Sequence, residues 1–247
     1  MSNASKYIRS IRLDRLRVPS FSKYPFNLPS IKDLEELSFH PNVTFIVGEN
    51  GTGKSTLLEA IAVAYGFNAE GGTKNFNFET RNTHSELNEY IKLVKGIKHP
   101  SDGFFLRAES FYNMASNIDD LDKGGISPRV IDAYGGVSLH EQSHGESFFA
   151  VLTNRFRGKG IYILDEPEAA LSPLRQLSMI TKIHELVNKD SQFIIATHSP
   201  IIMAYPNADI YKLGNGFRKI AYEETEHFQI MHDFMNNRKR MLEMLME

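Results

Sequence analysis

Residues 48–56 read Gly48-Glu49-Asn50-Gly51-Thr52-Gly53-Lys54-Ser55-Thr56. They follow directly on the β-branched run Val43–Val47 and lead into Ser55–Tyr65, where apolar residues recur at helical spacing. Glycines in such a strand-to-helix turn let backbone N–H groups face phosphate oxygens, and the helix amino-terminus adds its dipole. Lys54 adds a positive charge for the β and γ phosphates, and Ser55 can place its hydroxyl on Mg²⁺. The pattern therefore predicts a site for nucleoside triphosphate phosphates at Glu49 to Thr56.

Two carboxylates, Asp165 and Glu166, follow the apolar run Ile161–Leu164. In a parallel sheet the carboxyl end of this strand opens onto the same edge as the glycine-rich loop. Asp165 would then hold Mg²⁺ through water, and Glu166 would polarise the water that attacks the γ-phosphate. The alternative is that these acids only cap the next helix, since acidic side chains are favoured in a first turn.

A histidine, His198, follows a third apolar run, Phe193–Ala196. An imidazole at this strand end could reach the γ-phosphate and report its presence. A single histidine after a strand is otherwise a satisfied loop or core residue, and that interpretation stays open for His198 taken alone.

The rest of the chain alternates between strand-like and helix-like segments, which predicts a mostly parallel α/β sheet in a three-layer P-loop fold. Strands are expected at 104–106, 161–164 and 192–196, and helices around 87–94 and at 173–188 and 226–246. Apolar and basic residues alternate from Tyr7 to Val18 with a break in step near Asp14. That pattern predicts an antiparallel edge ribbon.

Composition excludes several classes of protein. The chain has 247 residues, 41% of them hydrophobic, so it can bury an ordinary core. Its net charge is −2, which gives no overall attraction to nucleic acid or to an anionic membrane. It has no cysteine, which excludes disulfides and thiolate chemistry. Apolar runs are too short for a membrane helix and the amino-terminus lacks a signal-peptide core, so we expect a cytoplasmic protein.

The order of the motifs resembles that of the ATP-binding cassette (ABC) ATPases. The glycine-rich loop comes first, and four segments follow it: Ser143-His144-Gly145-Glu146-Ser147, Leu164-Asp165-Glu166-Pro167, Ala170-Leu171-Ser172 and Thr197-His198-Ser199-Pro200. The chain is more narrowly similar to small stand-alone bacterial AAA/ABC-type ATPases, which have a Ser-His-Gly-Glu signature. The resemblance extends to the Tyr222–His227 stretch.

This resemblance implies a role for each matched residue. Lys54 and Ser55 would bind phosphate and Mg²⁺, Asp165 would support the metal, Glu166 would be the catalytic carboxylate and His198 the switch. The signature residues Ser143, Gly145 and Glu146 would act on ATP held by a second copy of the chain. His144 and Glu146 stand where transporter ATPases have Gly and Gln.

Two positions of the pattern stay open in the sequence. No glutamine follows the strand at 104–106, and either Glu109 or Ser110 could take that metal-facing role. Adenine would stack on an aromatic residue ahead of the glycine-rich loop, for which Tyr24, Phe26 and Phe39 are candidates. The last helix carries apolar residues at helical spacing, and either packs on the domain or forms a Met-rich surface for a partner.

We expect a single ABC-type ATPase domain. Its segments are an amino-terminal β ribbon (6–45), a nucleotide-binding core (46–110 and 148–220), a helical lobe with the signature (111–147) and a carboxyl-terminal helix (221–247). The expected function is Mg²⁺-dependent ATP hydrolysis with ATP-driven homodimerisation acting on an unidentified protein partner. The alternatives are the ATP-binding subunit of an ABC transporter and the ATPase of a DNA-maintenance or phage-defence complex. Four arginines in the amino-terminal ribbon leave nucleic acid possible but do not indicate it.

Overall fold

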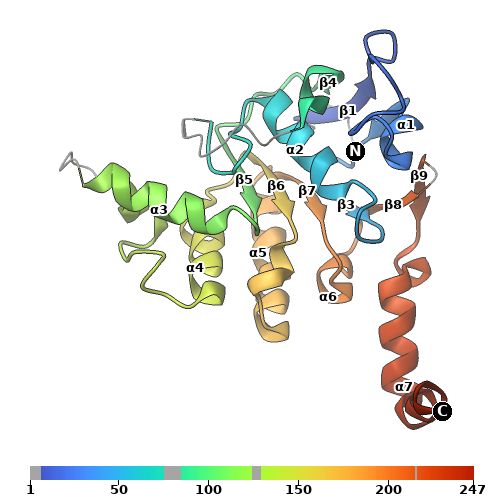
Figure 1. Ribbon diagram of the computed structural model, residues 1–247. Helices are drawn as coiled ribbons and strands as arrows, with labels where there is room; N and C mark the ends of the chain where they lie inside the picture. The colour runs from blue at the N-terminus through green and yellow to red at the C-terminus, as the bar shows by residue number, and fades with distance from the viewer. Residues whose placement is uncertain (1–6, 75–84, 124–128, 215) are drawn as a thin grey trace.

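The computed structural model describes residues 7–74, 85–123, 129–214 and 216–247 and contains a six-stranded sheet (Figure 1). The strand order is β5-β6-β7-β3-β8-β9, in which β5 to β8 run parallel and β9 pairs antiparallel with β8. The strands are β3 (Val43–Val47), β5 (Asp102–Arg107), β6 (Gly160–Asp165), β7 (Gln192–Ala196), β8 (Asp209–Gly214) and β9 (Gly216–Ile220). The predicted α/β fold with a mostly parallel sheet is confirmed.

Helices cover both faces of this sheet. One helix, α2 (Lys54–Tyr65), lies on one face, and the others lie on the opposite face (Figure 1). These are α3 (Phe111–Asp122), η3 (Val130–Tyr134), α4 (His144–Ala150), the π-helical turn η4 (Val151–Arg155), η5 (Pro167–Ala170), α5 (Pro173–Asn188) and α6 (Pro200–Met203). Cover on both faces explains why the strands are apolar throughout: all five residues of β3 are buried, and Phe45 and Ile46 enter different core clusters.

A second, antiparallel sheet packs against the outer side of α2. Its order is β2-β1-β4, with β1 (Ile8–Leu13) between β2 (Glu36–Ser38) and β4 (Ile91–Lys95). The break that we predicted near Asp14 is confirmed, since β1 ends at Leu13. The prediction of an edge strand is wrong, because β4 pairs with the other side of β1. The short elements α1 (Pro29–Lys32), η2 (Glu86–Glu89) and η6 (Tyr222–Glu224) complete the chain.

The helix that we expected around Leu87–Val94 is also wrong. Ser85 caps a single 3₁₀ turn, η2, and the chain then extends into β4, where Leu93 pairs with Ile11. The apolar residues Leu87, Ile91 and Leu93 fit a turn followed by alternation as well as they fit a helix, and only the pairing with β1 favours the strand. Helices at 173–188 and 226–246 and strands at 104–106, 161–164 and 192–196 are confirmed.

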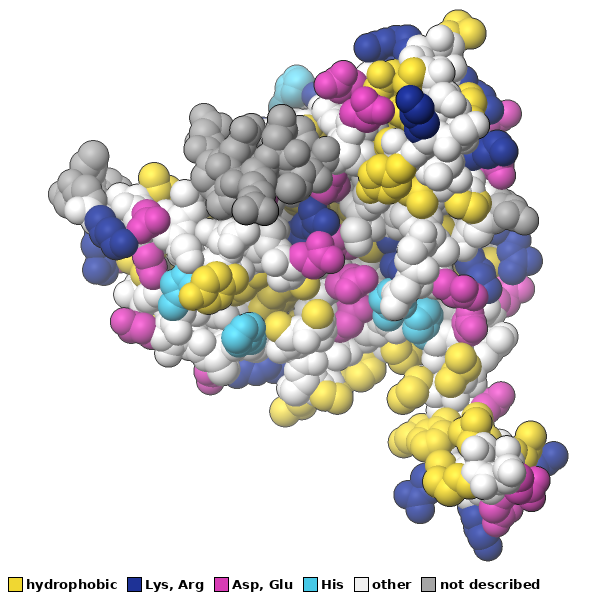
Figure 2. Space-filling model, in the orientation of Figure 1, with side chains coloured by type: hydrophobic (Ala, Val, Ile, Leu, Met, Phe, Trp, Pro, Cys, Tyr) yellow, Lys and Arg dark blue, Asp and Glu magenta, His cyan; other side chains and the backbone are white. Residues whose placement is uncertain are grey.

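The last helix, α7 (Glu226–Met246), extends away from the sheet and bends at Asn237, whose φ and ψ are −128° and 30° (Figure 1). None of its residues is buried, and its apolar side chains are visible at the surface in Figure 2. Met235 and Leu245 are about three-quarters exposed (73% and 75%). The interpretation that this helix packs on the domain as core is therefore wrong.

Candidate nucleotide site

The glycine-rich loop joins β3 to α2 at the carboxyl edge of the main sheet. Gly53 precedes α2 with φ of +94°, a conformation that favours glycine, and a Cβ there would lie 3.0 Å from Leu28. Lys54 is 4% exposed, and its Nζ donates hydrogen bonds to the carbonyls of Gly48 (2.9 Å) and Glu49 (3.0 Å). Burial lowers the pKa of Lys54, while Glu166 and two other carboxylates oppose that shift.

Asp165 ends β6, and its Oδ1 accepts a 3.1 Å hydrogen bond from Oγ of Ser55. Asp165 is 3% exposed, and burial raises its pKa to about 7, against the opposing charge of Arg107. A hydroxyl and a carboxylate at the phosphate loop are the oxygen ligands that Mg²⁺ takes in nucleotide sites. Among the described residues no group of three or more His, Asp or Glu could hold a metal alone. These two residues therefore fit an ion whose other ligands come from phosphate and water.

Glu166 adopts a left-handed backbone conformation, with φ of 51° and ψ of 52°. Its N–H donates to the carbonyl of Ala196 at 2.9 Å, which ties this turn to the end of β7. The side chain is 40% exposed, and its Oε1 lies 3.6 Å from Nε2 of His198. A non-glycine residue held in this region costs about 1 kcal/mol or more, and such strain clusters at active sites. The geometry thus leaves the carboxylate of Glu166 open to solvent beside the histidine.

His198 lies between two residues that the sequence did not single out. Its Nδ1 is 2.8 Å from Nε2 of His227, and its N–H donates to Oε1 of Glu168. Glu168 is partly buried, and desolvation raises its pKa; it also accepts a 2.7 Å hydrogen bond from Thr197. Burial and the charge of Lys54 lower the pKa of His198, against Glu166. Figure 2 shows histidines and acidic side chains close together on this face.

Arg107, the last residue of β5, is a further site residue missed in the sequence. Its guanidinium pairs with Glu59 at 2.6 Å and Glu109 at 2.8 Å, and its Nε is buried 3.8 Å from Asp165. The rule that found Asp165, a charged residue at the carboxyl end of a buried strand, could also have found Arg107. Glu109 has a side chain that is 77% exposed, and its partner is Arg107.

The signature residues form the start of α4. Ser143 is its N-cap, and the side chain of Glu146 accepts hydrogen bonds from the N–H and hydroxyl of Ser143. The carbonyl of Gly145 accepts a 3.0 Å hydrogen bond from Arg175, and a Cβ on Gly145 would lie 2.7 Å from the carbonyl oxygen of Ala170. Within the described part of the chain, no hydrogen bond or ion pair joins Ser143, Gly145 or Glu146 to the phosphate loop. The structure brings Ser55, Asp165, Glu166 and His198 together and leaves the signature outside that group.

The three aromatic candidates for adenine differ in exposure. Phe26 and Phe39 are 0% and 1% exposed and belong to the core. Tyr24 is 60% exposed, and its Oη lies 3.2 Å from Oγ1 of Thr56 at the start of α2. Burial removes Phe26 and Phe39 from the candidates and leaves Tyr24.

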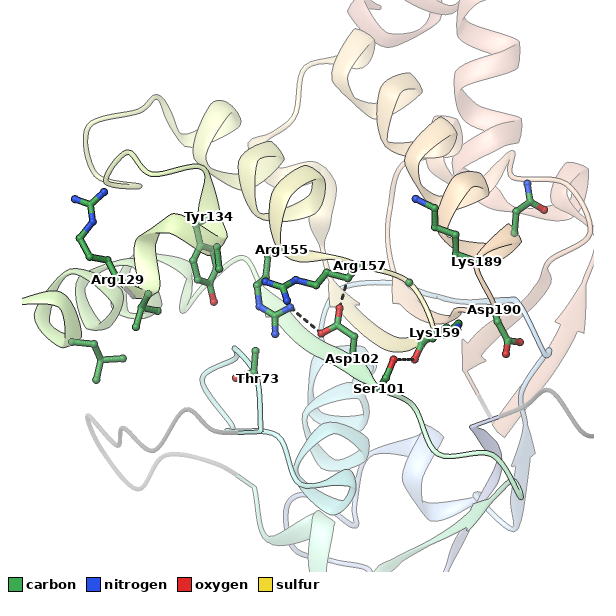
Figure 3. Close-up of a pocket in the computed structure, with 15 residues that line it drawn as sticks. Thr73, Ser101, Asp102, Arg129, Tyr134, Arg155, Arg157, Lys159, Lys189 and Asp190 are labelled. Atoms are coloured by element: carbon green, nitrogen blue, oxygen red, sulfur yellow. Dashed lines mark hydrogen bonds and ion pairs between the residues drawn. The ribbon is translucent and has the colours of Figure 1, made fainter. Parts of the chain in front are cut away.

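A cavity of about 980 Å³ lies away from this site, at the amino ends of β5 and β6 (Figure 3). Arg155 and the phenol of Tyr162 bind the partly buried Asp102 beside it, at 2.9 Å and 2.7 Å. The side chains of Arg129, Arg155 and Lys189 on its wall pair with carboxylates. We therefore assign the nucleotide chemistry to the other end of the strands.

None of the helices in the described ranges is both long enough and apolar enough to cross a membrane.

Comparison with known proteins gives two family models. One, described as "AAA domain", matches residues 23–144, and one described as "AAA domain, putative AbiEii toxin, Type IV TA system" matches residues 116–204. The chain is 26% identical over 203 residues to the energy-coupling factor transporter ATP-binding protein EcfA1 of Fusobacterium nucleatum, covering 75% of this chain and 76% of that protein. It is 28% identical over 191 residues to the cytochrome c biogenesis ATP-binding export protein CcmA of Legionella pneumophila, covering 73% and 92%.

Among solved structures, the chain is similar to cbiO1 from Clostridium perfringens, part of an ABC transporter complex, with a TM-score of 0.48 and 17% identity over 95% of this chain and 97% of that one. It is also similar to the SMC head domain from Thermotoga maritima, with a TM-score of 0.42 and 16% identity over 86% and 98%. The family models and the sequence relatives agree with the order of motifs and with the α/β fold. Together with the order of motifs, these matches support a P-loop ATPase of the ATP-binding cassette class.

Proposed function

We propose that this chain binds ATP with Mg²⁺ on the loop from Glu49 to Thr56 and hydrolyses it with Glu166 as the catalytic carboxylate. The observation that carries the proposal is that Asp165, Glu166 and His198 lie together at the edge of the main sheet where the phosphate loop follows β3. Ser55 and Asp165 would hold Mg²⁺, which neutralises phosphate charge when bound. Lys54 would add its charge to that of the metal at the β and γ phosphates.

The proposed reaction uses Glu166 to orient water. Its carboxylate accepts a hydrogen bond from the water, whose oxygen attacks the γ-phosphorus in line as the bond to ADP breaks. His198 would donate a hydrogen bond to a γ-phosphate oxygen. Glu166 is partly exposed next to His198, so its position fits contact with both the water and the phosphate.

The same proposal makes the site complete only between two copies of the chain. The amino-terminus of α4, with Ser143 and Gly145, is the kind of element that binds phosphate oxygens, yet it lies outside the group formed by the phosphate loop. A head-to-tail pair would bring this α4 against ATP on the partner, as the resemblance implies. ATP would then join the two copies, and its hydrolysis would release them to act on another protein.

The variant Glu166→Gln tests the proposal. It should bind ATP, lose turnover by roughly 100-fold or more, and elute as a dimer with ATP and Mg²⁺ in size-exclusion chromatography. Glu185→Gln is the matched control, because in the described part of the chain Glu185 forms its ion pairs with Lys182 and Lys189, near the carboxyl end of α5. Wild-type turnover in Glu166→Gln would contradict the catalytic role, and a monomer in saturating ATP would contradict the pairing.

Each of the two alternative functions, a transporter subunit and a defence complex, has one observation in its favour. The relatives are named as ATP-binding proteins of transporters and exporters, which favours a membrane partner. The match to a family described with the AbiEii toxin favours a defence complex instead. A pull-down from native lysate and a comparison of ATP turnover with and without duplex DNA separate them. A membrane protein in the pull-down supports the first, and stimulation by DNA supports the second.

A further inference from the structure

Two histidine rings meet at the end of β7. Nδ1 of His198 lies 2.8 Å from Nε2 of His227, and the ring centroids are 4.9 Å apart at an angle of 65°. His198 follows β7, whereas His227 stands in the first turn of α7, the helix that extends away from the domain. The first turn of α7 is thus in direct contact with the nucleotide site.

The segment before His227 fixes the place of its ring. The phenol of Tyr222 donates a 2.9 Å hydrogen bond to the carbonyl of Pro200, two residues after His198. Thr225 is 1% exposed, donates to the carbonyl of Tyr222 at 2.7 Å and caps α7. Glu224 accepts a 2.8 Å hydrogen bond from the N–H of Ala221. The bond from Tyr222 to Pro200 therefore anchors this segment beside His198, and the two local hydrogen bonds fix the start of α7.

The other polar atoms of His198 have different surroundings. Its backbone N–H is held by Glu168, as described above. Its Nε2 is buried and has no hydrogen-bond partner among the described residues, and Oε1 of Glu166 lies 3.6 Å from it. Nε2 is therefore the ring nitrogen left to face Glu166 and the expected γ-phosphate.

The chemistry of these neighbours selects one tautomer. Glu166 and phosphate oxygens are acceptors, so a lone pair on Nε2 would face other lone pairs, whereas a hydrogen on Nε2 would face acceptors. A neutral imidazole with hydrogen on Nε2 has its lone pair on Nδ1, and that lone pair needs a donor. His227 is the group in hydrogen-bond contact with Nδ1.

We infer that His227 donates its Nε2 hydrogen to Nδ1 of His198 and so holds His198 in the tautomer that presents a hydrogen to the γ-phosphate. This inference rests on the proposed function. His227 is a positioning residue, acting through His198, in the way that the second partner of a catalytic histidine fixes its tautomer. Burial and the charge of Lys54 lower the pKa of both imidazoles. Glu166 opposes this shift for His198, and Glu226 and Glu168 oppose it for His227. A lowered pKa favours the neutral form of both rings, which a single hydrogen between them requires.

A double-mutant cycle in the full chain tests the inference. We expect His227→Ala to lower kcat for ATP by roughly 10- to 100-fold with little change in KM. In a His198→Ala background the same substitution should have almost no further effect, because its target is gone. His227→Gln should recover much of the loss, since its amide can donate near the position of Nε2. His232→Ala is the control, because His232 lies on α7 and stacks on Phe228 away from the site.

The tautomer gives a second readout. In protein with ¹⁵N-labelled histidines, the signals of His198, assigned by their loss in His198→Gln, should show a hydrogen on Nε2 and a bare Nδ1. That pattern should weaken in His227→Ala and persist in His227→Gln. Thermal melts establish that each variant is folded, and His227→Leu, which fills the space without a donor, replaces His227→Ala in the cycle if the latter unfolds.

The outcomes distinguish this inference from the proposed function. Additive effects of the two alanine substitutions, or a hydrogen on Nδ1 of His198, would overturn the role of His227 while Glu166→Gln still loses turnover. If Glu166→Gln keeps wild-type turnover, the proposed function itself fails.

Discussion

Oγ of Ser55 donates a hydrogen bond to Oδ1 of Asp165 over 3.1 Å, although 110 residues separate them in the chain. Parallel pairing of β3 and β6 on either side of β7 puts their carboxyl ends at one edge and creates this contact. Asp165 is buried there, and burial raises its pKa, so the site favours a positive charge nearby.

We expect ATP turnover to depend on Mg²⁺ through this pair. EDTA should abolish turnover and added Mg²⁺ should restore it. Ser55→Ala and Asp165→Asn should each raise the Mg²⁺ concentration for half-maximal turnover by roughly 10- to 100-fold, because each removes an oxygen ligand. Ser178→Ala, on the exposed face of α5, should match the wild type. An unchanged Mg²⁺ dependence in both site variants would rule out this placement of the metal.

Tyr24 should stack on adenine. Tyr24→Ala is expected to raise KM for ATP by about 2- to 10-fold, the size of an aromatic stacking interaction, while Tyr24→Phe should stay close to the wild type. Phe26→Ala, by contrast, should lower stability by about 3 to 5 kcal/mol because Phe26 is fully buried. Titration with a fluorescent ATP analogue measures the nucleotide affinity of the Tyr24 variants, and urea unfolding measures the stability of Phe26→Ala. Equal affinity of Tyr24→Ala and wild type would exclude the stacking role.

Asp102 should stabilise the fold away from the site. Burial opposes its ionisation, but Arg155 and the hydrogen bonds from Tyr162 and the N–H of Arg157 outweigh burial and lower the pKa of Asp102. A lowered pKa in the folded state adds stability that is present above the unfolded value of about 3.9 and is lost as pH falls through the folded pKa. Asp102→Asn should therefore lower the free energy of unfolding by roughly 2 to 4 kcal/mol at pH 7, leaving Arg155 buried without its counter-charge.

Urea unfolding at several pH values checks this prediction. The stability deficit of Asp102→Asn should be full at pH 7 and pH 5. It should narrow below about pH 4, where the carboxylate of Asp102 begins to protonate in the unfolded wild-type chain. Asp120→Asn removes an exposed partner of Lys123 and should leave the free energy of unfolding close to that of the wild type. A deficit that did not vary with pH would show that shape, not charge, makes Asp102 stabilising.

Mixing two inactive variants tests whether the signature acts on the partner's ATP. Lys54→Ala loses its own phosphate site, and Ser143→Arg blocks the signature that it offers to another copy. Each should be inactive alone. In an equal mixture half of the dimers are mixed and each mixed dimer has one intact site, so turnover should recover to about a quarter of the wild-type value. No recovery, with both variants shown to be folded and able to form dimers, would contradict the trans arrangement.

The strands and helices with continuous or strictly periodic apolar residues were predictable. β6, β7 and α5 lie where the sequence puts them, because burial on two faces or on one helical face leaves a pattern in local sequence. α7 was also predictable from apolar residues at helical spacing, although none of its residues is buried. β4 and the β8–β9 hairpin were missed. Their alternation is short and mixed with polar residues, as in the Ile91–Lys95 strand, and pairing with β1 or β3 decides them.

The residues of the site likewise divide into those that the sequence predicted and those that only the structure revealed. The sequence alone located the glycine-rich loop, the two carboxylates at the end of β6 and the histidine after β7, because each lies at the end of a recognisable strand, and it predicted a phosphate site from them. Tertiary structure alone decided that Arg107 and Glu168 support these groups, that burial leaves Tyr24 as the exposed aromatic, and that His227 meets His198. Those contacts join residues from different elements, and such distances depend on how strands and helices pack, which no local pattern in the chain records.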